Sequence, residues 1–228
     1  MRTSLHVEMS GAPLSRAQSV VILLHGRGAT ADGMLALSKA LAQREFAYLA
    51  PQAPNGSWYP YSFLAPIEQN EPMLSRSLGA IGELIETISA KGVGKERIAL
   101  LGFSQGGCLA LEYAARNAWR YGGVIGLSAG LIGPNVTAAN YTGSLADTPV
   151  FIGCSDIDSH IPLRRVQESS NILRALGANV VERIYPAMGH TINDDEITQV
   201  YSMLANLLRS SSDPTTNKSI TTLSRSSE

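Results

Sequence analysis

Short runs of apolar residues alternate along this chain with longer stretches in which apolar residues recur every three or four positions. The short runs predict strands over residues 20–24, 46–50, 97–103, 122–127, 149–153 and 179–185. The longer stretches predict helices over residues 31–42, 74–90, 105–116, 163–176 and 192–208. In one of them, Ile81, Ile85 and Ile88 recur at spacings that place them on one helix face.

The predicted strands are nearly continuous apolar runs, so we expect both faces of their sheet to be covered. Strands that alternate with helices and are buried on both sides are typical of a parallel sheet in an α/β fold. Ligands of such sheets bind at the carboxyl ends of the strands. Residues that follow the predicted strands are therefore the first candidates for chemistry.

Two segments depart from this alternation. Residues 51–72 form a long connection without clear periodicity, and connections of that length inside a domain are often functional. Residues 210–228 are rich in Ser and Thr and nearly free of large apolar groups, which predicts a disordered C-terminal tail. The remaining residues, 1–209, are expected to form one domain.

Composition narrows the classes of function. The chain has 228 residues, of which 44% are hydrophobic and 16% charged, so it can build a sizeable core. Its net charge is −1 and its basic residues form no cluster, which argues against a nucleic-acid partner. Its two cysteines, Cys108 and Cys154, have no ligand-spaced Cys or His neighbours, so we expect buried free thiols and no metal site.

Targeting signals are not evident in the sequence. Residues 1–17 lack a continuous apolar stretch and include His6 and Glu8, unlike a secretory signal peptide. The apolar runs are of strand length and too short to span a membrane, so no stable membrane insertion is expected. Together with the free cysteines, these features predict a cytoplasmic protein.

The pentapeptide at residues 102–106 has the form Gly-x-Ser-x-Gly and follows the apolar run 98–101. A serine on a very tight turn from strand to helix projects its hydroxyl into solvent, and small residues on either side let the backbone pass. The N-terminus of the following helix favours negative charge that develops nearby. Ser104 is therefore the candidate nucleophile.

A serine nucleophile needs a base, and the base needs an acid to orient it. His190 lies just past the last predicted strand, where a catalytic histidine belongs when the order along the chain is nucleophile, acid, histidine. The acid should follow the strand 149–153, and two aspartates, Asp156 and Asp158, compete for that role. His160 lies close by, as a supporting group or as a partly exposed loop residue.

An oxyanion hole requires two backbone N–H donors aimed at the developing charge. Gln105, directly after the nucleophile, is one candidate, and Arg27, in the glycine-rich loop after the strand 20–24, is the other. The Arg27 side chain either faces the cleft, where it would favour an anionic group, or is solvated. His25 is expected to be a hydrogen-bonded structural residue beneath this loop.

Aromatic residues crowd into residues 58–63 of the long connection. Either they pack this loop onto the sheet, or Trp58 and its neighbours line a substrate pocket.

Together these motifs resemble the bacterial phospholipase/carboxylesterase family of α/β-hydrolases, which are relatives of the acyl-protein thioesterases. The resemblance extends from about residue 20 to residue 208. The matching segments are residues 24–28, 51–54, 102–107, 158–162 and 189–190. Jointly they are far more specific than the pentapeptide alone.

The resemblance implies a single-domain α/β-hydrolase without a cap domain, a metal or a cofactor. The family's nucleophile falls on Ser104 and its histidine on His190, and its acid, in an Asp-x-x-Val/Ile-Pro stretch, falls on Asp158. Its oxyanion donors fall on Arg27 and Gln105.

The function expected from motifs and resemblance is a serine carboxylesterase that hydrolyses small-molecule esters through an acyl-enzyme. The alternatives are an acyl-protein thioesterase, a lysophospholipase or a ligand-binding protein without turnover. A homodimer is left open.

Overall fold

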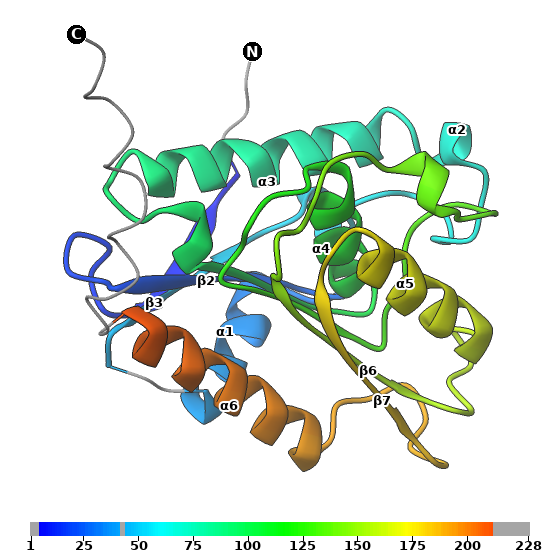
Figure 1. Ribbon diagram of the computed structural model, residues 1–228. Coiled ribbons are helices and arrows are strands. Elements are labelled where there is room, and N and C mark those ends of the chain that lie inside the picture. Colours follow the sequence, from blue (N-terminus) through cyan, green and yellow to red (C-terminus); the bar gives the residue numbers. More distant parts are fainter. Residues whose placement is uncertain (1–4, 42–43, 212–228) are drawn as a thin grey trace, which may run out of the picture.

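One twisted sheet of seven strands runs through the computed structural model, which describes residues 5–41 and 44–211 (Figure 1). The strands are β1 (Val7–Gly11), β2 (Ser19–Leu24), β3 (Phe46–Pro51), β4 (Ile98–Phe103), β5 (Gly123–Leu127), β6 (Pro149–Ser155) and β7 (Asn179–Tyr185). The α-helices are α1 (Ala31–Ala40), α2 (Ile67–Asn70), α3 (Met73–Ser89), α4 (Gln105–Arg116), α5 (Leu163–Ala175) and α6 (Asp194–Ser211). Short 3₁₀ turns lie at Pro54–Gly56, Lys95–Arg97 and Ala138–Asn140.

The strand order across the sheet is β1-β3-β2-β4-β5-β6-β7. All neighbouring pairs from β3 to β7 are parallel, whereas β1 pairs antiparallel with β3 at one edge. Parallel strands need crossover connections, which the helices supply. The carboxyl ends of six strands therefore lie along one edge of the sheet.

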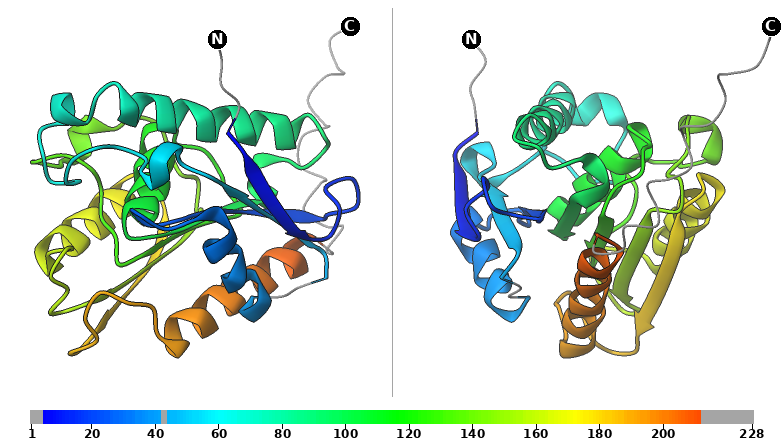
Figure 2. Two further views of the ribbon diagram at one scale, coloured as in Figure 1. Left: turned by 180° about the vertical axis from the view of Figure 1, so that it is seen from behind. Right: turned by 60° about the vertical axis from the view of Figure 1, so that its left-hand side comes forward.

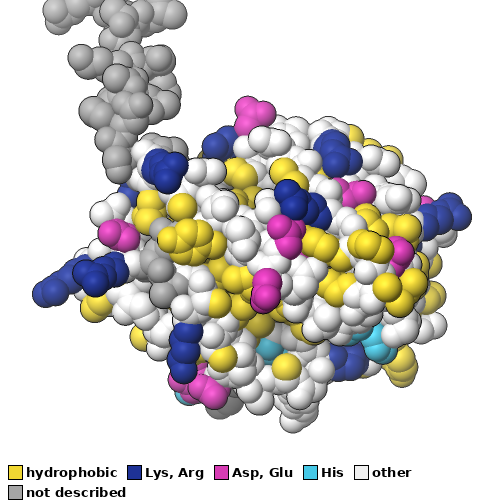
Figure 3. Space-filling model, turned by 90° about the horizontal axis from the view of Figure 1, so that it is seen from below, with side chains coloured by type: hydrophobic (Ala, Val, Ile, Leu, Met, Phe, Trp, Pro, Cys, Tyr) yellow, Lys and Arg dark blue, Asp and Glu magenta, His cyan; other side chains and the backbone are white. Residues whose placement is uncertain are grey.

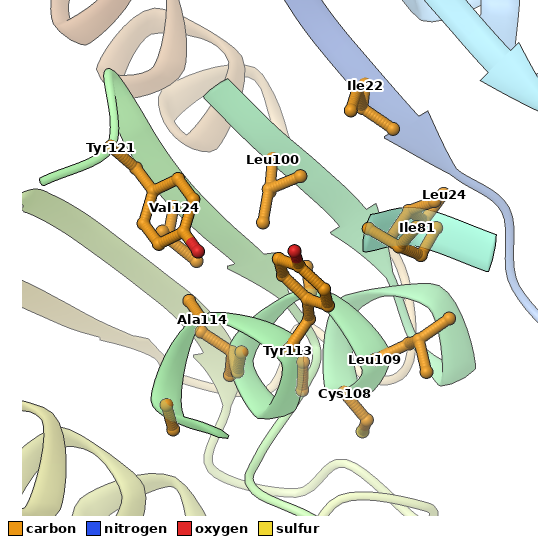
Figure 4. Packing of buried hydrophobic residues seen from close by; sticks show 14 of the residues in the cluster. Ile22, Leu24, Ile81, Leu100, Cys108, Leu109, Tyr113, Ala114, Tyr121 and Val124 are labelled. Carbon is orange, nitrogen blue, oxygen red and sulfur yellow. The ribbon is translucent and has the colours of Figure 1, made fainter. Parts of the chain in front are cut away.

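The helices lie on both faces of the sheet, with α3, α4 and α5 on one side and α1 and α6 on the other (Figures 1 and 2). Successive residues of β2 explain why its run is apolar throughout. Ile22 packs in the cluster that contains α3, α4 and α5 residues, and Leu23 packs in the cluster that contains α1 and α6 residues. On the first side, Tyr113 of α4 points toward Leu100 of β4 (Figure 4).

These observations confirm the predicted fold class, a single-domain α/β fold with a mostly parallel sheet and helices on both faces. The strand β1 was not predicted from the pattern. It is an edge strand with no fully buried residue, and Met9 in it is 65% exposed, so it lacks the apolar run that marks the inner strands.

The connection 51–72 holds only a 3₁₀ turn and the four-residue helix α2 before α3 begins. The predicted disordered tail falls largely on residues 212–228, which lie outside the described residues. Within the described part of the chain, no helix is both long and apolar enough to cross a bilayer. The face that carries α1 and α6 shows apolar side chains mixed with charged side chains of both signs (Figure 3).

Candidate active site

Ser104 lies between β4 and α4 with φ 53° and ψ −121°, a backbone conformation that is strained for a residue with a side chain. The glycines beside it cannot be replaced without a clash. A Cβ atom on Gly102 would lie 2.2 Å from the Gly106 carbonyl oxygen, and one on Gly106 would lie 2.2 Å from the Leu24 carbonyl oxygen. The spacing of the pentapeptide thus follows from close backbone packing around the serine.

Three predicted side chains form one chain of hydrogen bonds. The Ser104 Oγ lies 2.9 Å from His190 Nε2, and His190 Nδ1 lies 2.7 Å from Asp158 Oδ2. Because an ionised carboxylate only accepts, His190 Nδ1 carries the hydrogen and Nε2 is free to accept the proton of the serine hydroxyl. The three groups stand in the order that a nucleophile, a general base and an orienting acid require.

The Asp158 side chain is completely buried, yet it is well supplied with donors. Its Oδ1 accepts hydrogen bonds from the backbone N–H groups of His160, at 2.8 Å, and Ile161, at 3.0 Å. Burial raises the pKa of Asp158, but the hydrogen bonds from His190 and from these two amides outweigh it, so the net pKa lies below its ordinary value. The carboxylate is therefore ionised at neutral pH.

Asp156, the competing aspartate, does not contact His190. Its side chain accepts a hydrogen bond from the Ala187 N–H at 2.8 Å, in the loop that leads to the histidine. The same loop is tied at Gly189, whose N–H donates to Ser155 Oγ at 3.0 Å. Asp156 therefore anchors the histidine loop, and of the two aspartates Asp158 is the one that bonds to the imidazole.

The imidazole of His190 also packs against two other rings. The Phe103 ring centroid lies 5.0 Å from it and that of His160 lies 4.7 Å from it, the latter in an edge-to-face arrangement. The thiol of Cys154 donates to Asp158 Oδ2 at 3.7 Å. Sequence patterns did not reveal these contacts of Phe103 and Cys154, because ring and thiol packing leaves no spacing signal. Both cysteines are buried and free, as predicted.

The loop after β2 lies against the serine turn. A Cβ atom on Gly26 would lie 3.5 Å from the Ser104 Cβ. Neither the Arg27 N–H nor the Gln105 N–H has a hydrogen-bond partner among the described residues. Gln105 is the first residue of α4, where backbone donors have no partner within the helix and attract negative charge.

His25 is a structural residue, as predicted. It is buried, with Nδ1 2.8 Å from the Gly26 carbonyl oxygen, and its Nε2 accepts the N–H of Ala53 at 3.0 Å. Desolvation lowers the pKa of His25, and the bond to Gly26 opposes this only in part. The neutral imidazole joins the loop after β2 to the connection 51–72. That loop, residues 25–30, is here called the oxyanion loop because it carries the predicted donor Arg27.

Trp58, the tentative pocket residue, packs in the core of the protein. Its side chain is fully buried, and its Nε1 donates to the His25 carbonyl oxygen at 2.8 Å. The alternative, in which the loop packs onto the fold, is the one that the structure supports for this residue. Trp58 thus supports the oxyanion loop from beneath.

The Arg27 side chain is exposed, and its guanidinium donates to the carbonyl oxygens of Pro60 and Tyr61, each at 2.6 Å. These bonds direct it toward the connection 51–72. Among the described residues, no group of three or more His, Cys, Asp and Glu side chains could hold a metal ion.

Comparison with known proteins places this geometry in a family. Residues 7–208 match the model of the phospholipase/carboxylesterase family. The crystal structure of a phospholipase/carboxylesterase from Dyadobacter fermentans is 47% identical and superposes with a TM-score of 0.86, covering 89% of this chain and 97% of the other. Acyl-protein thioesterase 1 of Saccharomyces cerevisiae is 28% identical over 87% of this chain and 97% of its own length.

A more distant structure, that of esterase PE8, shares the fold at 23% identity. Its TM-score is 0.78, and the match covers 90% of this chain and 100% of the esterase. The family match spans nearly the whole described chain, including every residue of the site. The protein is a hydrolase that belongs to the phospholipase/carboxylesterase family of α/β-hydrolases.

Proposed function

We propose that the protein is a serine carboxylesterase that hydrolyses esters of small molecules through an acyl-enzyme. The observation that carries this proposal is the continuous hydrogen-bonded chain from Ser104 through His190 to Asp158. The N–H groups of Arg27 and Gln105, which have no partner in the described part of the chain, would supply the two donors that an oxyanion requires.

In acylation, the Ser104 Oγ attacks the ester carbonyl carbon while His190 Nε2 takes the hydroxyl proton. The carbonyl oxygen becomes an oxyanion that the N–H groups of Arg27 and Gln105 stabilise. His190 then gives its proton to the alcohol oxygen as the C–O bond breaks. The alcohol leaves, and the acyl group remains bonded to Ser104.

Deacylation repeats these steps with water. His190 takes a proton from the water as its oxygen attacks the acyl carbon, and the same N–H groups hold the second oxyanion. His190 then returns the proton to the Ser104 Oγ, which leaves, and the carboxylic acid is released. Asp158 stays ionised throughout, because its donors favour the charged form.

Thioester hydrolysis is the second candidate, and the similarity to acyl-protein thioesterase 1 supports it. The steps are the same except that a thiol leaves in place of an alcohol. A thiolate is a better leaving group than an alkoxide, so it depends less on proton transfer from His190. Ester and thioester substrates are therefore distinguished by their rates and not by a different set of residues.

A substrate panel tests the proposal. We would measure kcat and KM for oxygen esters and matched thioesters with acyl groups from acetyl to palmitoyl. We expect turnover of oxygen esters, and a loss of roughly 10³- to 10⁶-fold in kcat for Ser104→Ala. Near-parental turnover by Ser104→Ala would overturn the serine mechanism, and an absence of turnover for the whole panel would favour a binding protein. Faster kcat/KM for thioesters throughout would favour the second candidate.

A further inference from the structure

Residues 56–61, here called the brace segment, lie beside both candidate oxyanion donors. The Gly28 N–H, in the oxyanion loop, donates to the Gly56 carbonyl oxygen at 2.8 Å. Gly56 has φ +72°, and a Cβ atom there would lie 3.6 Å from the Ala29 carbonyl oxygen. The brace segment therefore packs directly on the loop that carries Arg27.

Gln105, the second candidate donor residue, is bonded to the same segment through its side chain. It is 5% exposed, and its Oε1 accepts the Trp58 N–H at 3.0 Å while its Nε2 donates to the Tyr59 carbonyl oxygen at 2.7 Å. One carboxamide thus bonds in both directions to the backbone of the brace segment. The orientation of the carboxamide is fixed. If it were turned by 180°, its NH₂ group would face the Trp58 N–H and its oxygen would face the Tyr59 carbonyl oxygen.

The Arg27 side chain contacts the brace segment from the opposite, exposed side. Its Nη1 donates to the Pro60 carbonyl oxygen and its Nη2 to that of Tyr61. Nη1 also donates to Ser57 Oγ at 3.2 Å, and Ser57 Oγ in turn lies 3.2 Å from Gln105 Nε2. The two donor residues are therefore linked to each other through this one segment.

The brace segment is itself held by the body of the protein. The Ser77 Oγ of α3 donates to the Trp58 carbonyl oxygen at 2.7 Å, and the Tyr61 N–H donates to Asn70 Oδ1 at 2.9 Å. Both Ser77 and Asn70 are buried. The segment thus offers fixed acceptors to the side chains of Gln105 and Arg27.

We infer that Gln105 and Arg27 are positioning residues for the oxyanion hole. Through the brace segment, their side chains hold the two backbone N–H donors in a fixed position relative to each other. The inference rests on the proposed function. An oxyanion hole stabilises the transition state only when its donors are already aimed at the position of the oxyanion, and small displacements are costly. Anchoring the two donor residues to one rigid segment fixes the separation and direction of their N–H groups.

The test removes the side chain of Gln105 or of Arg27 and leaves the backbone N–H donor of that residue in place. We expect Gln105→Ala to lower kcat by roughly tenfold to a hundredfold, less than deletion of a donor, with KM changed by less than about threefold. The affinity for an alkyl boronic acid, whose adduct with Ser104 directs an oxygen to the hole, should fall by the same factor as kcat/KM. A general loss of stability would lower the fraction of folded enzyme, but it would not weaken boronate binding to the folded enzyme by the same factor as kcat/KM.

Arg27→Met is the second variant, because Arg27 is exposed and its loss threatens folding less. It should lower kcat in the same way, and the double variant should lose less than the product of the two single losses, since both side chains act through one segment. Asn117→Ala is the matched control. It removes a carboxamide at the other end of α4, where Nδ2 donates to the Tyr113 carbonyl oxygen at 3.0 Å, and kcat should stay at the parental value.

Parental kcat and boronate affinity in folded Gln105→Ala, or in Arg27→Met if the first variant does not fold, would overturn the inference. That result leaves the proposed function intact if Ser104→Ala is inactive in the same assay. Full activity in Ser104→Ala would instead remove the proposed function, and the inference with it.

Discussion

The imidazole of His190 is fixed on every side that the proposed chemistry uses. Asp158 accepts from Nδ1, the Ser104 hydroxyl lies at Nε2, and the rings of Phe103 and His160 pack against it. A histidine held this way has one tautomer and one orientation, both of which a general base requires. The ionised Asp158 also stabilises the imidazolium that forms when the serine proton moves.

Replacing Asp158 by Asn tests this arrangement. The amide removes the charge and can donate to Nδ1, which would favour the wrong tautomer of His190. We expect kcat to fall by about 10⁴-fold, the effect of the equivalent change in other catalytic triads. The measurement is kcat for the best ester of the panel, with folding checked by circular dichroism.

Asp156→Asn is the control for that variant. An asparagine keeps an oxygen that can accept the Ala187 N–H, so the histidine loop stays anchored and kcat should change by less than about fivefold. Equal losses in the two variants would contradict the assignment of Asp158 as the orienting acid.

Individual residues differed in how far the sequence could predict them. Ser104 and His190 follow strands, and their positions carry motifs. Asp156 and Asp158 lie two positions apart in one loop, so patterns alone could not separate them, and only the family's Asp-x-x-Ile-Pro stretch favoured the second. The directions of the Trp58 and Arg27 side chains could not be predicted, because Trp58 lies in the aperiodic connection 51–72 and Arg27 in the glycine-rich loop after β2, and neither segment has a period that defines a face.

At the scale of elements, α6 begins with a reciprocal cap just after the histidine loop. The Asn193 Oδ1 accepts the Glu196 N–H at 2.8 Å, and the Glu196 Oε2 accepts the Asn193 N–H at 2.9 Å. The side chain of Glu196 is fully buried, and its Oε1 has no partner among the described residues. Burial is the main cause that raises the pKa of Glu196 to about 7.

This raised pKa predicts how stability depends on pH. Below the ordinary carboxyl pKa of 4.5 both the folded and the unfolded states are protonated at Glu196. Between that value and about 7 only the unfolded state ionises, so the contribution of Glu196 to stability is lost as pH rises through this window. The loss is on the order of 3 kcal/mol, at about 1.4 kcal/mol for each pH unit.

Glu196→Gln should lack this decline, because an amide does not ionise and still accepts the Asn193 N–H. We expect the unfolding free energy of the variant, relative to the parent, to rise by up to about 3 kcal/mol between about pH 4 and about pH 8. Urea unfolding of both proteins across that range is the measurement. Parallel pH profiles would show that Glu196 ionises normally in the folded state.

The pattern predicted those elements whose sequences carry an apolar run or a helical period. The inner strands and the amphipathic helices α3 and α6 were predicted within a few residues of their ends, because their apolar positions are set by the core. Both edge strands lack fully buried residues. The strand β7 was predicted because its sequence is rich in apolar and β-branched residues, whereas β1, with the sequence Val-Glu-Met-Ser-Gly, carries no apolar run and was missed. Helix α2 has only four residues, too few for a period to be recognised.

At the scale of the whole molecule, the parallel sheet brings the site together. The oxyanion loop follows β2, Ser104 follows β4, Asp158 follows β6 and His190 follows β7. The carboxyl ends of parallel strands meet at one edge, so residues far apart in the chain become neighbours. The alternation of strands and helices predicted this edge, but the order of strands within the sheet depends on packing that the pattern does not encode.

Covalent labelling of Ser104 tests the central claim most directly. The 228-residue chain would be treated with an alkyl fluorophosphonate and examined by intact mass and peptide mapping. The account predicts a single phosphonyl adduct on Ser104, no adduct in Ser104→Ala, and slower labelling in His190→Ala, because the serine then lacks its base. An unlabelled parent protein, or an adduct that persists in Ser104→Ala, would contradict it.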